Sequence, residues 1–192
     1  MEVKVNHLTK SFGNLNVFTQ LSLSLYSGRI YCLMGPSGSG KTTFLRILLG
    51  LETADSGSIE GLDGIMSSAV FQENRLCEPF NPIDNIVMVI PGRASISRKQ
   101  VREGLLRLLP EEALSRPVST LSGGMKRRVA IVRALSVPCD MILMDEPFTG
   151  LDENTKLSVI QYIKEKTHDK LVIISTHQEE DVALLRGTLI TM

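Results

Sequence analysis

The stretch GPSGSGKT at residues 35–42 decides the fold class, because it matches the phosphate-binding pattern G-x-x-x-x-G-K-[ST]. It follows the apolar run Ile30–Met34, which is typical of a strand buried on both faces of a parallel sheet. Helix formers occupy Thr42 to Leu49 and end at Gly50. Glycines let the backbone wrap closely around a phosphate, and the following helix presents the positive end of its dipole. The sequence therefore predicts a strand, a phosphate-binding loop and a helix, in that order.

The rest of the chain extends this unit in both directions. Two more apolar runs, Met141–Met144 and Leu171–Ile174, are expected to be buried strands, separated by a helix from about Glu153 to Lys166. Alternating polar and apolar residues predict strands within residues 1–34, and a last strand is expected at Thr188–Met192. This alternation of strands and helices predicts an α/β fold with a mostly parallel sheet.

The middle of the chain, residues 73–137, contains no convincing buried strand and is expected to be helical. Ser97 and Gln100 fit a capping box at the start of one helix, which Pro110 would end. Ser122 is a candidate cap for a second helix. Upstream, the prolines of residues 72–91 predict an irregular segment.

Composition excludes several classes of protein. The 192 residues include 21 basic and 21 acidic side chains, so there is no overall positive field of the kind that drives nucleic-acid binding. The cysteines, Cys32, Cys77 and Cys139, lie far apart, so neither a disulfide framework nor a zinc site is supported. No apolar run approaches the roughly 20 residues needed to span a bilayer, and the first residues lack the apolar core of a signal peptide. We expect a cytoplasmic chain that does not cross a membrane by itself.

Two residues of the phosphate loop and two residues after the 141–144 strand carry the chemistry that we expect. Lys41 is expected to reach the β- and γ-phosphates of a nucleotide, and the Thr42 hydroxyl to bind Mg²⁺. Asp145, at the end of the 141–144 strand, suits Mg²⁺ coordination, and Glu146 suits the polarisation of an attacking water. An Asp-Glu pair after a strand is by itself more often a solvated strand end, but a phosphate loop upstream favours the catalytic interpretation.

A third motif, Leu121-Ser122-Gly123-Gly124, precedes a basic helix. Its hydroxyl, its glycine N–H groups and the helix N-terminus would form a second anion site, and the alternative is a plain helix cap. Here the sequence resembles the nucleotide-binding subunits of ABC transporters, whose signature is L-S-G-G-Q, with Met125 replacing the glutamine. The resemblance implies one cassette over residues 1–192. It would have a P-loop NTPase core (1–72 and 138–192), an N-terminal antiparallel β subdomain and a helical insert (73–137).

The resemblance also implies roles for individual residues. Phe12 matches the aromatic position that stacks on adenine, although a core phenylalanine is the alternative. Gln72 matches the glutamine that contacts Mg²⁺ and the attacking water, Thr149–Asp152 resembles the D-loop, and His177 matches the switch histidine. The implied nucleotide-binding residues are Phe12, Gly35, Pro36, Ser37, Gly38, Ser39, Gly40, Lys41, Thr42, Thr43, Ser122, Gly123 and Gly124. The implied catalytic residues are Lys41, Gln72, Glu146 and His177, and the implied metal ligands are Thr42, Gln72 and Asp145.

The implied function is ATP hydrolysis with Mg²⁺ in a head-to-tail dimer, where each signature closes over the ATP of the other cassette. The dimer would drive a separate transmembrane permease from the inner face of the membrane, with an extracytoplasmic solute-binding protein as a further partner of an importer. The permease contact is expected near Gln72–Pro91, with Leu76, Phe80 and Ile83 as apolar contacts. Residues 71–76 and 121–125 look most similar to importers of nitrate, sulfonate and taurine.

Three alternatives remain at this level. A subunit of a lipid or peptide exporter would share the same motifs. An ABC-type ATPase of DNA repair would need long coiled coils or lobes, for which 192 residues leave no room. A small-molecule kinase would not explain the motif at residues 121–124.

Overall fold

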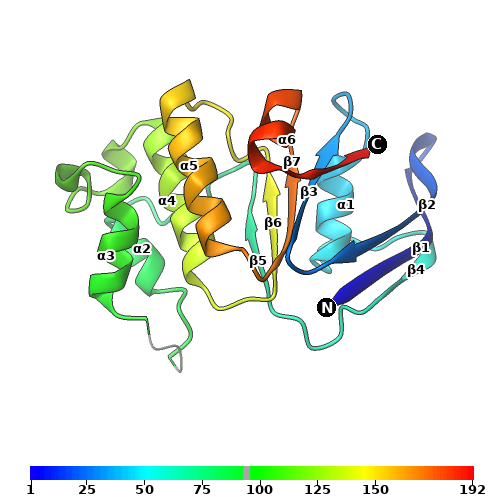
Figure 1. The fold of residues 1–192 in the computed structure, drawn as a ribbon, viewed down its shortest axis with the longest axis horizontal. Coiled ribbons are helices and arrows are strands. Elements are labelled where there is room, and N and C mark those ends of the chain that lie inside the picture. The colour runs from blue at the N-terminus through cyan, green and yellow to red at the C-terminus, as the bar shows by residue number, and fades with distance from the viewer. Residues whose placement is uncertain (93–95) are drawn as a thin grey trace.

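The computed structural model describes residues 1–92 and 96–192, whose strands form two sheets (Figure 1). The larger sheet is parallel, and its strands lie in the order β5 (Ser67–Val70), β6 (Met141–Asp145), β7 (Leu171–Ser175), β3 (Arg29–Met34) and β8 (Thr188–Thr191). The smaller sheet is antiparallel and has the order β2 (Leu15–Tyr26), β1 (Glu2–Phe12) and β4 (Ser56–Glu60).

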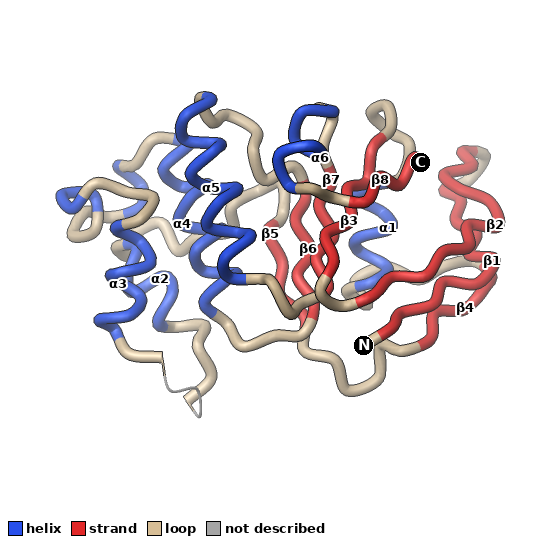
Figure 2. Tube along the Cα trace, viewed as in Figure 1, coloured by secondary structure: helices blue, strands red, loops and turns tan. Residues whose placement is uncertain are grey.

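The helices lie around the parallel sheet and beyond one end of it. They are α1 (Lys41–Leu48), α2 (Pro82–Val87), α3 (Arg98–Leu106), α4 (Gly123–Ser136), α5 (Glu153–Lys166) and α6 (Glu179–Leu185), with short 3₁₀ turns at Glu111–Ala113 and Val118–Thr120. Figure 2 shows the antiparallel sheet at one end of the molecule, α2 and α3 at the other end, and the parallel sheet between them. No helix in the described ranges is both long and apolar enough to span a bilayer.

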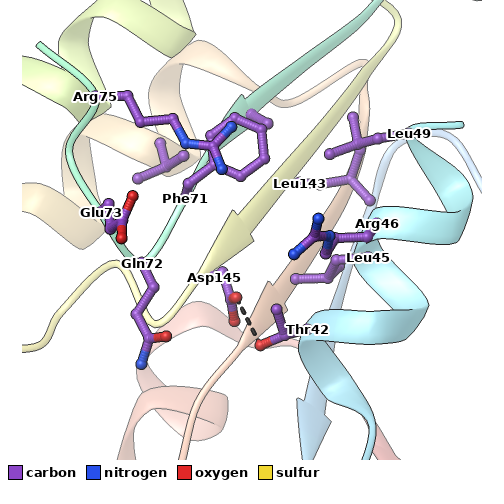
Figure 3. A pocket seen from close by; sticks show the side chains of 12 residues that line it. Thr42, Leu45, Arg46, Leu49, Phe71, Gln72, Glu73, Arg75, Leu143 and Asp145 are labelled. Carbon is purple, nitrogen blue, oxygen red and sulfur yellow. Dashed lines mark hydrogen bonds between the residues drawn. The ribbon is translucent and has the colours of Figure 1, made fainter. Parts of the chain in front are cut away.

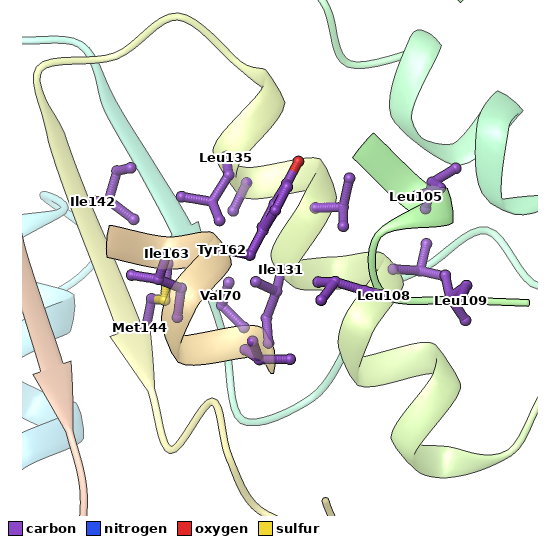
Figure 4. Close-up of a cluster of buried hydrophobic side chains, with 14 of the residues drawn as sticks. Val70, Leu105, Leu108, Leu109, Ile131, Leu135, Ile142, Met144, Tyr162 and Ile163 are labelled. Atoms are coloured by element: carbon purple, nitrogen blue, oxygen red, sulfur yellow. The ribbon is translucent and has the colours of Figure 1, made fainter. Parts of the chain in front are cut away.

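The central strands of the parallel sheet, β6, β7 and most of β3, are buried on both faces, which explains why they are continuous apolar runs. Ile142 and Met144 of β6 belong to a cluster with side chains of α3, α4 and α5, part of which is seen in Figure 4. Met141 and Leu143 of the same strand belong to a second cluster, formed with α1 and the antiparallel sheet. Successive residues of one strand thus pack into two different cores.

Most of the predicted elements are confirmed. The strands at 30–34, 141–144, 171–174 and 188–192 are present, and the helix predicted over 153–166 is α5. Strands β4 and β5 and helix α6 were not predicted, because each is short and β4 and β5 are built largely of small residues. The fold is that of a P-loop NTPase, with an antiparallel β region preceding the parallel sheet, as expected.

The prediction of an irregular segment over residues 72–91 is wrong in part, because helix α2 begins at Pro82. Proline is tolerated in the first helical turn, where its missing N–H would have no partner inside the helix. The Asn81 side chain caps this helix by accepting from the backbone N–H of Asp84 at 2.9 Å. Pro82 therefore starts a helix here and does not prevent one.

Candidate functional site

The phosphate loop follows β3 directly and leads into α1. Within it, the Lys41 side chain is only 5% exposed, and its ammonium group donates to the carbonyl oxygens of Gly35 at 2.8 Å and Pro36 at 3.0 Å. Gly40 has a φ of 97°, and a Cβ built there would lie 2.4 Å from Val17 Cγ1. Only glycine fits this position, because any Cβ would clash with Val17 and the backbone is left-handed.

One hydroxyl of the loop is suited to a bound phosphate. Ser39 Oγ is buried and has no hydrogen-bond partner among residues 1–92 and 96–192. Leaving a buried hydroxyl unpaired is unfavourable, so this group fits an acceptor such as a phosphate oxygen. The loop thus fits the phosphates of a nucleotide by the chemistry of its side chains as well as by its glycines.

A chain of hydrogen bonds connects α1, β6 and β7 at the carboxyl ends of the strands. Thr42 Oγ1 donates to Asp145 Oδ2 at 2.7 Å (Figure 3), and Ser175 Oγ donates to Asp145 Oδ1 at 2.6 Å. Ser175 also accepts from the backbone N–H of Glu146 at 2.9 Å. Asp145 is 6% exposed, and the oxygens of Thr42 and Asp145 form a donor set of the kind that Mg²⁺ prefers.

Glu146 and His177 are in direct contact. His177 Nε2 lies 2.8 Å from Glu146 Oε1, and the Thr149 hydroxyl donates to Glu146 Oε2 at 3.4 Å. Glu146 has a φ of 47°, a left-handed conformation that is uncommon for a residue other than glycine and often occurs at functional sites. The hydrogen bond from its N–H to Ser175 fixes this backbone conformation. The carboxylate itself is held by His177 at one oxygen and by Thr149 at the other.

The structure brings most of the predicted site residues to one cavity beside the antiparallel sheet. Leu15 and Val17 of β2 also line this cavity and were not predicted from the sequence. Phe12 is 49% exposed and lies outside the buried core, which excludes the alternative of a core phenylalanine. The complete lining is Phe12, Leu15, Val17, Ser37, Gly38, Gly40, Lys41, Thr42, Thr43, Gln72, Glu146 and His177.

A second pocket lies between α1 and the segment that follows β5 (Figure 3). Thr42 and Asp145 are at one end of it, and Gln72 lines both this pocket and the cavity described above. Arg46 of α1 and Arg75 lie on opposite sides of it in Figure 3. The Arg75 guanidinium carbon lies 3.7 Å from the centroid of the Phe71 ring, a cation–π contact.

The motif at residues 121–124 lies elsewhere. Ser122 Oγ accepts from the backbone N–H of Met125 at 3.2 Å and so caps α4, as the sequence predicts. None of residues 122–124 lines the cavity that holds Lys41. Gly124 approaches the loop at 149–152 closely, since a Cβ built on it would lie 3.1 Å from the Gly150 carbonyl oxygen.

Helix α4 holds the backbone around Gln72 with two arginines that the sequence did not single out. Arg127 donates to the carbonyl oxygens of Phe71, at 2.6 Å, and Gln72. Arg133 donates to the carbonyl oxygens of Asn74, at 2.9 Å, and Arg75, at 2.7 Å. Burial lowers the pKa of Arg127, and the Asp145 and Glu146 carboxylates act in the opposite direction. The helix that begins at Ser122 is thus tied to the loop that carries Gln72.

Of Ser175 and Arg127, only Ser175 has a signal in the sequence that marks it as a site residue. Ser175 is the first polar residue after the apolar run 171–174, and a polar residue at the carboxyl end of a buried strand is a signal of a site. Arg127 belongs to a basic run on a helix, which usually indicates a solvated face, and nothing local marks it as 6% exposed.

The apolar contacts predicted for a partner differ in exposure. Phe80 is 48% exposed, whereas Leu76 and Ile83 are partly buried and pack against the core cluster. Met88 and Val89, just after α2, are 49% and 40% exposed. The exposed apolar surface in this region is therefore formed by Phe80, Met88 and Val89, of which only Phe80 was named from the sequence.

Known proteins resemble this chain over its whole length. The family model described as ABC transporter matches residues 18–149. Sulfate/thiosulfate import ATP-binding proteins CysA of Photorhabdus laumondii and Escherichia coli K12 are each 34% identical over all of this chain. The same protein of Acinetobacter baylyi is 35% identical. The chain spans 58% to 60% of the length of these relatives.

Solved structures agree with this result. The dimeric structure of the bacterial ABC transporter cassette MJ0796 has a TM-score of 0.84 and 27% identity, covering 99% of this chain and 94% of that one. A post-hydrolysis state of the same cassette, bound to ADP and Pi, has a TM-score of 0.83 over the same share of both chains.

Proposed function

The chain belongs to the ABC transporter family, and from this we propose that it is the ATP-binding and ATP-hydrolysing subunit of a membrane importer. The observation that supports this most is the single cavity in which the phosphate loop meets Thr42, Gln72, Glu146 and His177. This arrangement places a carboxylate and an imidazole beside a phosphate-binding loop, which suits phosphoryl transfer because that reaction depends mainly on positioning and charge stabilisation.

Each group has one task in this proposal. The loop N–H groups and Lys41 bind the phosphates, and the Phe12 ring stacks on the adenine. Glu146 accepts the proton of the attacking water, and His177, 2.8 Å away, holds the glutamate in place. Thr42, Asp145 and Gln72 would hold Mg²⁺, which supplies positive charge that neutralises the phosphates.

Two cassettes form the active unit. Ser122, Gly123 and Gly124 offer a helix N-terminus for an anion but lie outside the cavity that contains Lys41. In a head-to-tail dimer, residues 122–124 of one chain would close over the ATP bound to the opposing chain, so this second half-site would have a ligand. The dimeric MJ0796 cassette supports this arrangement.

A transmembrane permease is the partner that the dimer drives, which places the cassette at the inner face of the membrane. The exposed apolar side chains of Phe80, Met88 and Val89 and the neighbouring pocket with Arg46 and Arg75 suit a short partner helix. An extracytoplasmic solute-binding protein would complete the importer.

We propose a small anionic solute, and sulfate or thiosulfate is favoured because the relatives named above carry these solutes in their names. Nitrate, sulfonate and taurine, which the motifs at 71–76 and 121–125 favoured, stay a prediction that these relatives do not support in particular. Within the chain we propose one cassette with a core of residues 1–72 and 138–192 and a helical insert of residues 73–137.

The first test is the replacement of Lys41 by alanine. We expect ATP binding in isothermal titration calorimetry to weaken at least tenfold, because the mutation removes the one ammonium group buried in the loop. Lys4→Ala, which removes an exposed lysine of β1, is the matched control and should bind as the parent does. Equal ATP affinity of the Lys41→Ala variant and the parent would contradict the assignment of the site.

A second experiment separates the classes of function. The protein is isolated from native membranes under mild conditions, and its companions are identified by mass spectrometry. Recovery of a permease together with a solute-binding protein supports an importer, and recovery of a permease alone favours an exporter. Recovery only in the soluble fraction favours an ATPase outside transport, and phosphorylation of an acceptor molecule would instead indicate a kinase.

A further inference from the structure

A lysine lies against the exposed aromatic ring of the nucleotide cavity. Lys10 Nζ is 4.7 Å from the centroid of the Phe12 ring, two residues further along β1. The ring is 49% exposed and lines the cavity, whereas Lys10 is only 7% exposed. The ammonium group thus contacts a half-exposed ring that also lines the cavity.

The ammonium group is fixed in this position by two carboxylates. Lys10 Nζ lies 3.0 Å from Glu52 Oε1 and 3.4 Å from Asp55 Oδ1, both in the segment between α1 and β4. Asp55 in turn accepts from the backbone N–H of Ser11 at 2.7 Å, and its own N–H donates to the carbonyl of Thr9 at 2.9 Å. Glu52 raises the pKa of Lys10, so the side chain stays charged at neutral pH.

This contact has a consequence for nucleotide binding. A cation over an aromatic ring is attracted to it, and the attraction is stronger when the cation is shielded from water. The attraction restricts the rotation of the ring, and a ring that is already ordered loses less entropy when a base stacks on it. A Phe12 ring that rotated freely would lose all of this entropy when the base binds.

We propose that Lys10 is a positioning residue that orients the Phe12 ring for stacking with the base of the bound nucleotide. This inference rests on the proposed function, in which Phe12 contacts the base. Lys10 contributes to the affinity for a triphosphate that carries a base and contributes nothing to the binding of the phosphates, which the loop at residues 35–42 holds.

The test compares ATP with inorganic tripolyphosphate, which has phosphates and no base. In Lys10→Met we expect the Kd for ATP in calorimetry to rise about three- to tenfold, the range of a partly shielded cation–π contact. The Kd for tripolyphosphate and the kcat of ATP hydrolysis should stay unchanged. Lys10→Arg keeps a cation over the ring and should restore the ATP affinity.

Two further variants guard against effects on folding. Lys10→Gln keeps a hydrogen-bond donor for Glu52 and Asp55 and should lose ATP affinity as Lys10→Met does. Lys166→Met removes another lysine over an aromatic ring, that of Tyr162 at 5.8 Å, and should change neither Kd because neither residue lines the nucleotide cavity. An equal loss of ATP and tripolyphosphate binding in the Lys10 variants would overturn the proposal, since it would indicate a purely structural role.

A double-mutant cycle separates this inference from the proposed function. If both hold, Phe12→Ala weakens ATP binding, and adding Lys10→Met to it causes no further loss. If Phe12→Ala leaves ATP affinity unchanged, the proposed contact of Phe12 with the base fails. If Phe12→Ala weakens ATP binding but Lys10→Met does not, only the role of Lys10 fails.

Discussion

Ser175 illustrates how a single side chain can order two carboxylates with different tasks. Its hydroxyl donates to Asp145 Oδ1 and accepts from the N–H of Glu146, and the residue is fully buried. The first hydrogen bond orients the carboxylate that we propose as a Mg²⁺ ligand, and the second fixes the left-handed backbone of Glu146. Because Ser175 is fully buried, removing its hydroxyl would leave polar groups beside it unpaired.

We therefore expect Ser175→Ala to lower kcat for ATP hydrolysis by about ten- to a hundredfold, the effect typical of a lost partner behind a metal ligand. The KM for ATP should change much less, because the phosphate loop is untouched. Steady-state kinetics at several Mg²⁺ concentrations measure this, and a higher Mg²⁺ requirement is expected.

Ser68→Ala is the matched control, since this serine of the neighbouring strand β5 bonds instead to the Ala134 carbonyl. It should leave kcat unchanged. A Ser175→Ala variant with parental kcat and Mg²⁺ dependence would show that Asp145 and Glu146 are oriented without it.

At the scale of elements, the starts of the helices were the most predictable features. Ser97 and Gln100 form the expected capping box, with the Ser97 hydroxyl accepting from the Gln100 N–H at 3.2 Å and the Gln100 side chain accepting from the Ser97 N–H at 2.8 Å. A capping box is predictable because all its groups lie within four residues. Helix α2 is not predicted by the sequence, because its cap Asn81 is followed directly by a proline, a residue that interrupts helices except in their first turn.

Replacing Ser97 by alanine should destabilise the protein by about 1 kcal/mol, because the backbone N–H of Gln100 in the first turn of α3 loses the hydroxyl to which it donates. Urea unfolding followed by circular dichroism measures this as a lower transition midpoint. Ser115→Ala, which removes only a long 3.5 Å hydrogen bond to Glu112, is the control and should stay within about 0.5 kcal/mol of the parent. Identical midpoints for the two variants would argue against the contribution of the capping box.

At the scale of the whole molecule, the two sites that we propose for phosphate binding lie apart. The cavity with Lys41 lies at the carboxyl ends of β3, β6 and β7, whereas Ser122 begins a helix whose N-terminus approaches Gly150. Arg127 and Arg133 connect that helix to the backbone next to Gln72. If a nucleotide bound to a second chain contacted Ser122, it would contact the N-terminus of α4. That helix is hydrogen-bonded to the backbone beside Gln72, which lines the cavity of the same chain as Ser122.

Glu146→Gln should form a stable dimer with Mg²⁺ and ATP, because the amide cannot accept the proton of the attacking water and the closed state persists. Size-exclusion chromatography with light scattering should show twice the mass of one chain at saturating ATP. The double variant Lys41→Ala, Glu146→Gln cannot retain the nucleotide and should remain a single chain. A Glu146→Gln protein that stays monomeric at saturating ATP would contradict the head-to-tail arrangement.

The sequence by itself determined the phosphate loop, the strands at 30–34, 141–144 and 171–174, and the helices capped by Ser97 and Ser122, since each depends on residues close together in the chain. Only the tertiary structure decided which distant groups meet. Thr42 and Asp145 are 103 residues apart, and Arg127 lies 56 residues after the Phe71 carbonyl to which it donates. Neither pair leaves a periodic signal, because the order of strands in the sheet and the packing of α4 against the segment after β5 bring them together. Lys10 over Phe12 belongs to the same class, since the Glu52 and Asp55 carboxylates that fix it come from beyond the first helix.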